Sequence, residues 1–357
     1  MSADFVIIGG GVIGCATALE LALRGVRVTL VERSQIGGES SWAGGGILSP
    51  LLPWDYKEPV TGLAQWSASL YPDWVDDLQS LTGIDPEYQA GGMLVLPEFD
   101  GRKADAWSNT HKARVEHIVS HSLMPELGVE RNSLWLPEVA QVRNPRLIKA
   151  LAKRLEMAGV QIVKDTEGTE ILHIGNKVTG LRTTQNLISG GQYIVAGGAW
   201  SKPILGELAP KLPLKPIRGQ MLLFKVNPGE LSHIVLQNGV YLIPRRDGHI
   251  LVGSTLEDVG FDKSTTKEAA TQLHAVAAGI FPRLAREQPI QHWAGLRPGS
   301  PDNIPVISRH PDIENLYVNS GHFRYGVTMA PGSARILGNM IFGKPQPIDV
   351  LPYQWPL

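Results

Sequence analysis

The sequence has little cysteine, no block of like charges and no long hydrophobic run. Its single cysteine, Cys15, cannot form a disulfide within the chain, which fits a reducing cytosol. Lysine and arginine total 33 residues against 34 aspartates and glutamates, for a formal net charge of -1. With this balance and no block of like charges, we expect no nucleic-acid partner. The cysteine content favours a cytoplasmic location.

The most apolar stretch, residues 5–19, is shorter than a membrane span and is interrupted by glycines. It follows Asp4, whereas a targeting segment would begin with basic residues. No other run is long and apolar enough to cross a bilayer, so the sequence predicts no membrane span. At 357 residues the chain is long for one core, which favours two domains.

The chain begins with the pattern of a βαβ unit. Residues 5–8 and 26–31 are β-branched runs typical of parallel strands covered on both faces, and a helix at 16–24 lies between them. A helix at 145–158 followed by a strand at 160–163 predicts a return to the same sheet. We also expect a helix at about 61–81, parallel strands at 192–195 and 316–318, and a helix at about 327–341.

In two other regions, residues 94–142 and 212–252, the pattern changes to short alternating strands separated by turns, for example 220–225 and 240–245. This pattern indicates a separate antiparallel sheet. The predicted fold class is therefore α/β, with an N-terminal Rossmann-type domain interleaved with a smaller α+β substrate domain built on an antiparallel sheet. The division assigns residues 1–55, 145–205 and 290–357 to the nucleotide-binding domain, and residues 56–144 and 206–289 to the substrate domain.

The first glycine turn predicts a dinucleotide site. The run Gly9-Gly10-Gly11-Val12-Ile13-Gly14 satisfies G-x-G-x-x-G, directly follows a strand and opens a helix. Gly9 permits the tight turn, Gly11 allows close approach of a pyrophosphate, and Gly14 allows the helix to pack on the strand. Glu32 ends the next strand, where a carboxylate binds ribose hydroxyls but repels a 2′-phosphate, which disfavours NADP and leaves NAD and FAD open. The alternatives are a turn without a ligand and a solvated Glu32.

Further motifs extend from one end of the chain to the other. They are Val6–Gly14 with Val31-Glu32-Arg33, Ser40–Leu48, Tyr193–Ser201, Tyr241–Arg245, Trp293–Gly299, and Gly321–Gly326 with Ala330-Pro331. Together they resemble the D-amino-acid-oxidase group of flavoproteins, and within it most closely the bacterial glycine oxidases of thiamine biosynthesis. The last two motifs are the specific ones, because many unrelated flavoproteins share the first.

The resemblance implies that the N-terminal glycine turn holds FAD. The flavin is expected to be bound without a covalent link, because the only cysteine, Cys15, lies inside the first helix. No metal is expected. The residues that the resemblance assigns to the cofactor are Gly9, Gly11, Val12, Ile13, Gly14, Glu32, Arg33, Ser40, Ser41, Ala43, Gly44, Gly45, Gly46, Ala196, Gly197, Trp200, Gly321, His322, Arg324, Tyr325 and Gly326.

The resemblance also implies the substrate site. Arg297 is expected to grip a carboxylate with two parallel bonds, Tyr241 to donate to the other oxygen, and Arg324 to lie beside ligand and flavin. The residues alone leave alternatives open: an internal ion pair for either arginine, and a core aromatic for Tyr241. His322 is interpreted as a structural histidine in preference to a base. Gly239 replaces a histidine of the thiamine-linked relatives, which leaves the pocket's polarity open.

The implied reaction is oxidative deamination of glycine or another small amine or amino acid. Hydride passes from Cα to flavin N5, the imine hydrolyses to a 2-oxo acid and ammonia, and dioxygen reoxidises the flavin to give hydrogen peroxide. The alternatives are a D-amino-acid oxidase, a sarcosine oxidase, a dehydrogenase that uses a quinone, and a flavin-binding module without catalysis. Because such relatives are commonly multimers, we expect a homo-oligomer.

Overall fold

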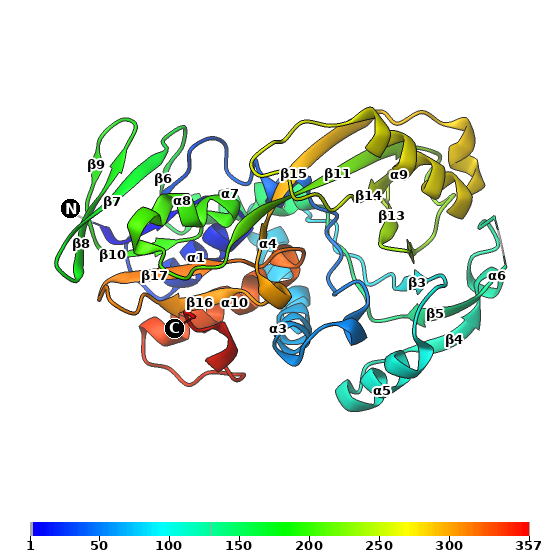
Figure 1. Ribbon diagram of the computed structural model, residues 1–357, viewed down its shortest axis with the longest axis horizontal. Coiled ribbons are helices and arrows are strands. Elements are labelled where there is room, and N and C mark those ends of the chain that lie inside the picture. Colours follow the sequence, from blue (N-terminus) through cyan, green and yellow to red (C-terminus); the bar gives the residue numbers. More distant parts are fainter. Residues whose placement is uncertain (1–2, 129, 357) are drawn as a thin grey trace.

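The computed structural model describes residues 3–128 and 130–356, and the strands of these residues form three sheets (Figure 1). The first has six strands, in the spatial order β16 (Val306–Arg309), β17 (Leu316–Ser320), β10 (Gly190–Val195), β1 (Ala3–Ile8), β2 (Val28–Val31) and β6 (Gln161–Val163). All neighbours in it are parallel except the edge strand β16, which pairs with β17 in the antiparallel sense.

Both faces of β1 are buried, which explains its continuous apolar sequence. Phe5 and Ile7 pack into a core with α1 (Val12–Leu23) and α10 (Gly326–Ile341). Val6 and Ile8 face the opposite core. Residues of the three-stranded sheet and of α8 (Ser201–Leu205) complete that second core. The strands of the small sheet are β7 (Gly168–Ile174), β8 (Lys177–Thr183) and β9 (Leu187–Ile188). The predicted parallel sheet, covered on both sides, is confirmed.

The third sheet has eight strands and is antiparallel except where β12 meets β3. In spatial order its strands are β15 (Gln291–Gly299), β11 (Lys215–Lys225), β14 (His249–Gly253), β13 (Val240–Pro244), β12 (Ile234–Gln237), β3 (Met93–Val95), β5 (Asn132–Leu136) and β4 (Glu116–Val119). Helix α9 (Lys267–Ile280) packs on this sheet through Leu273 and Ala277. The expected α/β class with a second, antiparallel sheet is confirmed.

Two segments differ from what the sequence suggested. Strand β15 belongs to the eight-stranded sheet, because it pairs with β11 from Lys215↔Gly299 to Leu223↔Gln291, although residues from 290 onward were assigned to the nucleotide-binding domain. The predicted helix at 61–81 is two helices, α3 (Glu58–Ser69) and α4 (Tyr71–Thr82), both packed in the core of α1 and α10. Pro72 in the first turn of α4 cannot donate the backbone hydrogen bond that would continue α3. The domain boundaries themselves stay a prediction.

Four further α-helices lie in the connections between strands of the described residues, and α7 precedes β6. Their bounds are α2 (Ser40–Ala43), α5 (Gly101–His111), α6 (Ser120–Leu123) and α7 (Asn144–Met157).

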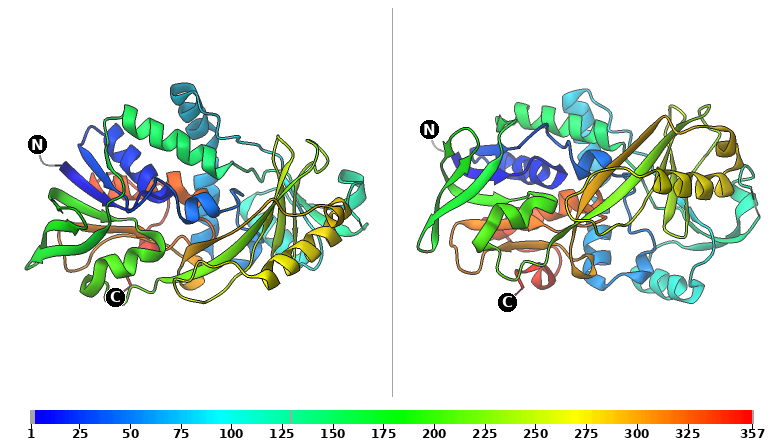
Figure 2. Two further views of the ribbon diagram at one scale, coloured as in Figure 1. Left: turned by 90° about the horizontal axis from the view of Figure 1, so that it is seen from above. Right: turned by 45° about the horizontal axis from the view of Figure 1, so that its top comes forward.

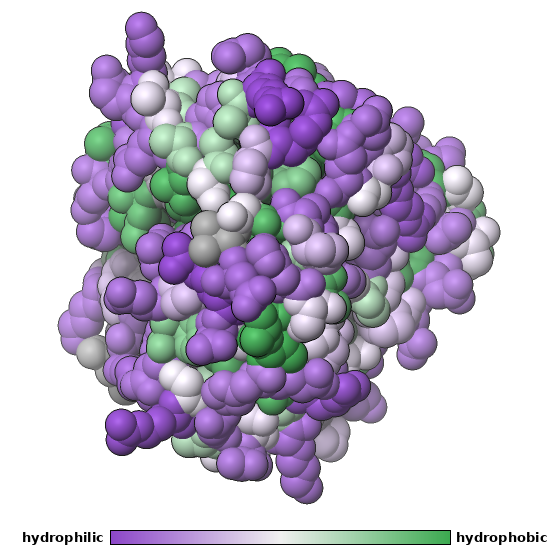
Figure 3. Space-filling view, turned by 90° about the vertical axis from the view of Figure 1, so that its right-hand side faces the viewer, coloured by the Kyte–Doolittle hydropathy of each residue, from purple (hydrophilic) through white to green (hydrophobic). Residues whose placement is uncertain are grey.

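The molecule is elongated, with the six-stranded sheet towards one end and the eight-stranded sheet towards the other (Figure 2). The long pair β11 and β15 leads from one part into the other. Hydrophilic residues cover most of the end face formed by the eight-stranded part, where hydrophobic residues show as small separate areas (Figure 3). Among the helices of the described residues, none has the length and hydrophobicity needed to cross a membrane.

Candidate active site

A cavity of about 460 Å³ lies where the two large sheets meet. Its walls include the glycine turn after β1, the end of β2 at Glu32, and Ala196 after β10. Tyr241 from β13 and Arg297 from β15 line it from the eight-stranded sheet. The carboxyl ends of parallel strands are where open α/β sheets bind their ligands, so this is the position expected of a nucleotide site.

The glycine turn has the backbone that a dinucleotide requires. Gly9 adopts a φ of +111°, and a Cβ there would lie 2.5 Å from Ala196 O. A Cβ at Gly14 would overlap Gly9 O, so this glycine lets α1 pack closely against the turn. Gly11 caps α1 in an extended conformation. Backbone therefore borders the cavity directly, and the partial positive charge of the α1 N-terminus faces it.

Two side chains fix this turn. One oxygen of Glu32 accepts from Gly10 N at 2.7 Å, and the other accepts from Ser34 N at 3.1 Å. A carboxylate has further acceptor sites, so Glu32 can still bind ribose hydroxyls. Ser41 Oγ accepts from Val12 N at 2.9 Å, so one amide that we expected to face a phosphate has a protein partner in this structure.

The loop of Gly44, Gly45 and Gly46 lies between the cavity residues of the six-stranded sheet and those of the eight-stranded sheet. Gly46 adopts a φ of +77°, and its carbonyl accepts from Val142 N at 2.9 Å. Arg245, which is buried, donates to Gly45 O at 2.7 Å. A Cβ on Gly45 would lie 3.1 Å from the ring of Tyr241. The loop thus runs directly beside the aromatic ring that we expected in the substrate site.

At the Glu32 end, Arg33 stacks on Trp200, with its guanidinium carbon 3.7 Å from the ring centroid. Arg33 also pairs with Glu39, whose other oxygen pairs with Lys263 at 2.8 Å. Arg33, Glu39 and Trp200 all line the cavity. A planar guanidinium stacked on an indole makes a flat wall, which suits an aromatic base.

Arg297 is a guanidinium without an acidic partner among the described residues. Its side chain reaches from β15 across Gly219 of β11, where an added Cβ would overlap the guanidinium. Nη2 donates to Ser254 Oγ at 2.6 Å, and Nη1 donates to Thr255 O at 3.2 Å. Both acceptors are neutral, so the positive charge is uncompensated at the cavity wall. An arginine in this state is suited to bind a carboxylate.

Burial lowers the pKa of Arg297 most; Tyr241 opposes this shift, and the charge of Arg324 adds to it. Tyr241 is 7% exposed, and its hydroxyl donates to Met221 Sδ at 3.3 Å. Sulfur is a weak acceptor, so a carboxylate oxygen would be the stronger partner for this hydroxyl. Arg324, from the segment between β17 and α10, also lines the cavity. The positive charge of Arg324 adds to that of Arg297, so the two together favour an anionic ligand.

His322 has the environment of a structural histidine. It is 1% exposed, and its Nε2 lies 2.9 Å from Ser333 Oγ on α10. Burial lowers the pKa of His322 to about 3, so the ring is neutral near pH 7. This geometry favours the structural interpretation over a base.

The predicted residues largely come together. The cavity lining includes every predicted cofactor and substrate residue except Gly14, Ala43 and Gly321. Gly14 and Ala43 pack behind the lining, against Gly9 O and Gly295 respectively. Gly321 lies at the end of β17 with a φ of +87°. The functional roles of all these residues stay predictions.

Sequence reasoning missed several lining residues. They are mainly Glu39, Ile47, Leu51, the segment 166–169 at the start of β7, Asn319 and Ser320. Asn319 is 0% exposed, and its Oδ1 has no hydrogen-bond partner in the part of the chain that the structure describes. An unpaired buried oxygen in a cavity fits a polar ligand group. In the sequence, the only signal for Asn319 is its position one residue before the end of β17.

Glycine backbone borders the cavity after β1, and a carboxylate lies just after β2, which is the geometry of a dinucleotide-binding protein. The model of the DAO family, described as FAD dependent oxidoreductase, matches residues 4–340. The chain therefore belongs to the DAO family of FAD dependent oxidoreductases. FAD is its cofactor, as the sequence predicted.

Individual relatives are similar over their whole length. The glycine oxidase of Pseudomonas aeruginosa is 45% identical over 99% of this chain and 98% of its own. That of Pseudomonas putida is 41% identical over the same shares of the two chains, 99% and 98%. The crystal structure of glycine oxidase from Geobacillus kaustophilus superposes with a TM-score of 0.93 at 26% identity, covering 99% of this chain and 98% of that one. The protein is thus a glycine oxidase-like flavoenzyme.

The contact between Arg297 and Gly219 yields a test. Gly219→Ala is expected to push the flexible guanidinium aside and to weaken the binding of acetate, a minimal carboxylate, by about tenfold while FAD stays bound. Acetate binding is measured by titrating the absorbance of the bound flavin. Gly279→Ala on α9, where no atom lies within 4 Å of an added Cβ, is the control. Unchanged acetate affinity in Gly219→Ala would contradict the contact.

His322 yields a prediction about acid stability. Its folded pKa lies below its unfolded value, so below pH 6.5 the unfolded chain binds a proton that the folded protein does not. The free energy of unfolding then falls by up to ~1.4 kcal/mol per pH unit as the pH drops from about 6.5 towards 3. Between pH 7 and pH 5, the free energy of unfolding of His322→Gln should therefore fall by ~2 kcal/mol less than that of the wild type.

The measurement is urea unfolding of the flavoprotein at both pH values with FAD in excess. His173→Gln, at an exposed histidine on β7, is the matched control and should follow the wild type. Equal losses in His322→Gln and the wild type would show that His322 is not the responsible group.

Proposed function

We propose that the protein catalyses the oxidative deamination of glycine or another small amine or amino acid. The observation that carries this proposal is the guanidinium of Arg297 at the cavity wall, which donates to Ser254 Oγ and Thr255 O and has no ion pair with an acid of the described residues. A ligand carboxylate supplies the missing negative charge. The similarity to glycine oxidases over nearly the full chain supports a small amino acid as the source of that carboxylate.

In this proposal Arg297 and Tyr241 bind the two carboxylate oxygens, and this pairing fixes the direction of the Cα–H bond. Arg324 adds positive charge beside the same carboxylate. The glycine loop packs on the ring of Tyr241, so it sets how closely the substrate site and the cofactor site approach. When bound, FAD would supply the oxidising power, because a flavin can take up a hydride, two electrons with one proton, and pass the electrons to dioxygen.

The proton balance follows from the side chains around the cavity. The acids among its lining residues are Glu32, Glu39 and Glu167. The first two lie in the segment after β2 and the third in the connection before β7, whereas the clamp comes from β13 and β15. His322 is held neutral by burial, which lowers its pKa, and by its contact with Ser333. We therefore assign no protein base to the amine, whose proton passes to solvent before the oxidation.

The overall reaction balances without a further reactant. Glycine, dioxygen and water give glyoxylate, ammonia and hydrogen peroxide. The Cα–N bond is first oxidised to an imine, and water then cleaves the imine outside the redox step. Self-association of the chain stays a prediction.

The test begins with the wild-type flavoprotein under anaerobic conditions. Glycine is expected to bleach the flavin absorbance, and air to restore it with release of peroxide. Sarcosine, D-alanine and D-proline in parallel cuvettes define the substrate class. If dioxygen does not restore the absorbance but a quinone does, the protein is a dehydrogenase. If no amine bleaches it, the proposed function is wrong.

Arg297→Ala tests the clamp itself. Loss of two charge-assisted hydrogen bonds should raise KM for glycine by roughly a hundredfold, because ~3 kcal/mol of binding corresponds to two powers of ten. Binding of FAD should stay unchanged. Arg182→Ala on β8, an exposed arginine paired with Glu170, is the control for removal of an arginine. Wild-type KM in Arg297→Ala would remove this residue from the site.

A further inference from the structure

The guanidinium of Arg297 is oriented by hydrogen bonds to a segment on the far side of β11. The segment Ser254–Glu257 follows β14 and continues its pairing with β11 through Arg218 N to Glu257 O at 2.8 Å and Glu257 N to Arg218 O at 3.0 Å. Arg297, from β15 on the other side of β11, crosses Gly219 to reach Ser254 and Thr255. The two acceptors that hold the clamp therefore belong to this segment.

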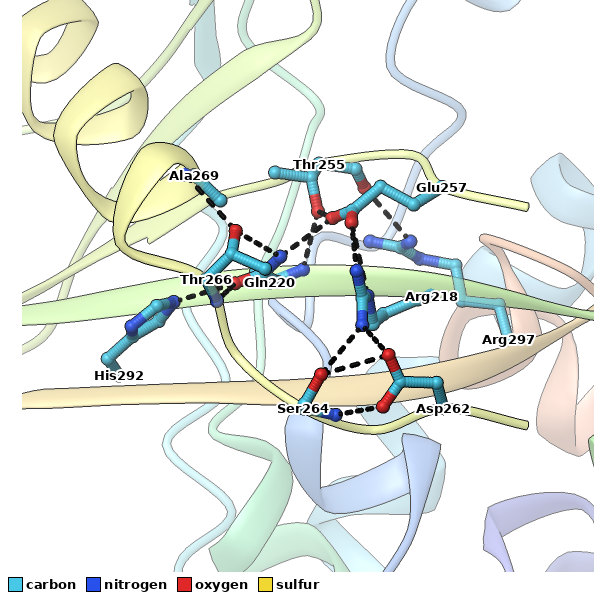
Figure 4. Close-up of polar contacts among 10 residues, drawn as sticks. All are labelled: Arg218, Gln220, Thr255, Glu257, Asp262, Ser264, Thr266, Ala269, His292 and Arg297. Atoms are coloured by element: carbon cyan, nitrogen blue, oxygen red, sulfur yellow. Dashed lines mark hydrogen bonds and ion pairs between the residues drawn. The ribbon is translucent and has the colours of Figure 1, made fainter. Parts of the chain in front are cut away.

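One carboxylate holds the segment in place. Glu257 Oε2 accepts from Arg218 Nη2 at 2.5 Å and from Nε at 3.1 Å. Its Oε1 accepts from Gln220 Nε2 at 2.9 Å and from the hydroxyl of Thr255. Figure 4 shows Glu257 beside Arg218 and Thr255, with the guanidinium of Arg297 directed at Thr255. Thr255 thus receives Arg297 through its carbonyl and donates to Glu257 through its side chain.

The surrounding bonds make this anchor rigid. Thr255 Oγ1 also accepts from Gln220 N at 2.8 Å, so the residue is fixed at both groups. Gln220 Oε1 accepts from Thr266 N at 2.8 Å, which ties the network to the start of α9. Arg218 is 4% exposed and also pairs with Asp262 at 2.5 Å. A carboxylate that accepts from three separate side chains restricts each of them.

We propose that Glu257 is a positioning residue for the carboxylate clamp, acting through Thr255 and Ser254 on Arg297. This inference rests on the proposed function of Arg297. Glu257 itself lies on the other face of β11 from the guanidinium, because Arg218 and Gln220 alternate along the strand with Gly219. Loss of its charge would remove the bond that holds the Thr255 hydroxyl and weaken the bonds to Arg218 and Gln220, while the backbone pairing with Arg218 remains. The two acceptors would then fix the guanidinium against Gly219 less firmly.

The test compares Glu257→Gln with the wild type in the FAD-bound protein. Glutamine cannot accept from both the Arg218 fork and the Gln220 amide. We expect acetate affinity, followed by flavin absorbance, and KM for glycine to worsen by about tenfold, with kcat within threefold and FAD affinity unchanged. Asp262→Asn is the matched control, since it removes the other acid on Arg218, and it should keep acetate affinity within twofold.

A double-mutant cycle separates positioning from general stability. In an Arg297→Lys background the fork is absent, so adding Glu257→Gln should change acetate affinity by less than twofold. A tenfold loss in both backgrounds would overturn the proposal, and so would wild-type acetate affinity in Glu257→Gln. If Glu257→Gln fails to fold, Thr255→Val removes the same link, and its unchanged acetate affinity would overturn the proposal too.

These outcomes are distinct from failure of the proposed function. If the wild type binds acetate but no amine bleaches its flavin, amine oxidation is refuted. The acetate affinities of the variants then still decide whether Glu257 positions Arg297. A wild type that binds no acetate would overturn the clamp and the role of Glu257 together.

Discussion

The constraint on which the site depends is a cation held at a cavity wall without an acid to balance it. Removing a guanidinium from water costs free energy unless hydrogen bonds and an opposite charge replace the solvent. Ser254 and Thr255 provide the hydrogen bonds for Arg297, but both are neutral. The nearby charge of Arg324 increases the cost. In the proposed function, a bound carboxylate supplies the missing negative charge.

That arrangement requires two sheets with different tasks. The six-stranded sheet brings its strand ends and the N-terminus of α1 to one side of the cavity, where glycine backbone borders it. The eight-stranded sheet contributes side chains from β13 and β15, which stand on rigid, hydrogen-bonded strands. The loop of Gly44 to Gly46 lies between them, held by Val142 and Arg245 and packed on Tyr241. In the proposed function, the position of the substrate relative to the cofactor therefore depends on how the two sheets pack.

Sequence patterns were sufficient for some elements and not for others. The strand β1, the glycine turn and α1 were predictable because each depends on local chemistry: apolar residues buried on both faces, a positive φ at Gly9, and close packing at Gly14. The break between α3 and α4 was missed, although Pro72 marks it, because the apolar pattern continues across it. The pairing of β15 with β11 was not foreseen, since β11 lies more than sixty residues earlier and no local signal names a partner. The small sheet of β7, β8 and β9 was not foreseen.

The sequence by itself determined the class of cofactor site and the identity of the charged groups, because a glycine pattern and an arginine among glycines state their chemistry locally. It did not determine what surrounds Arg297. The alternative of an internal ion pair could be set aside for the described residues only when the fold showed two neutral acceptors around the guanidinium. Likewise, the neutral state of His322 follows from its burial against Ser333, and the link from Glu257 to the clamp follows from the pairing of β11 with a distant segment. Burial and charge balance depend on residues far apart in the chain, so only the tertiary structure decides them.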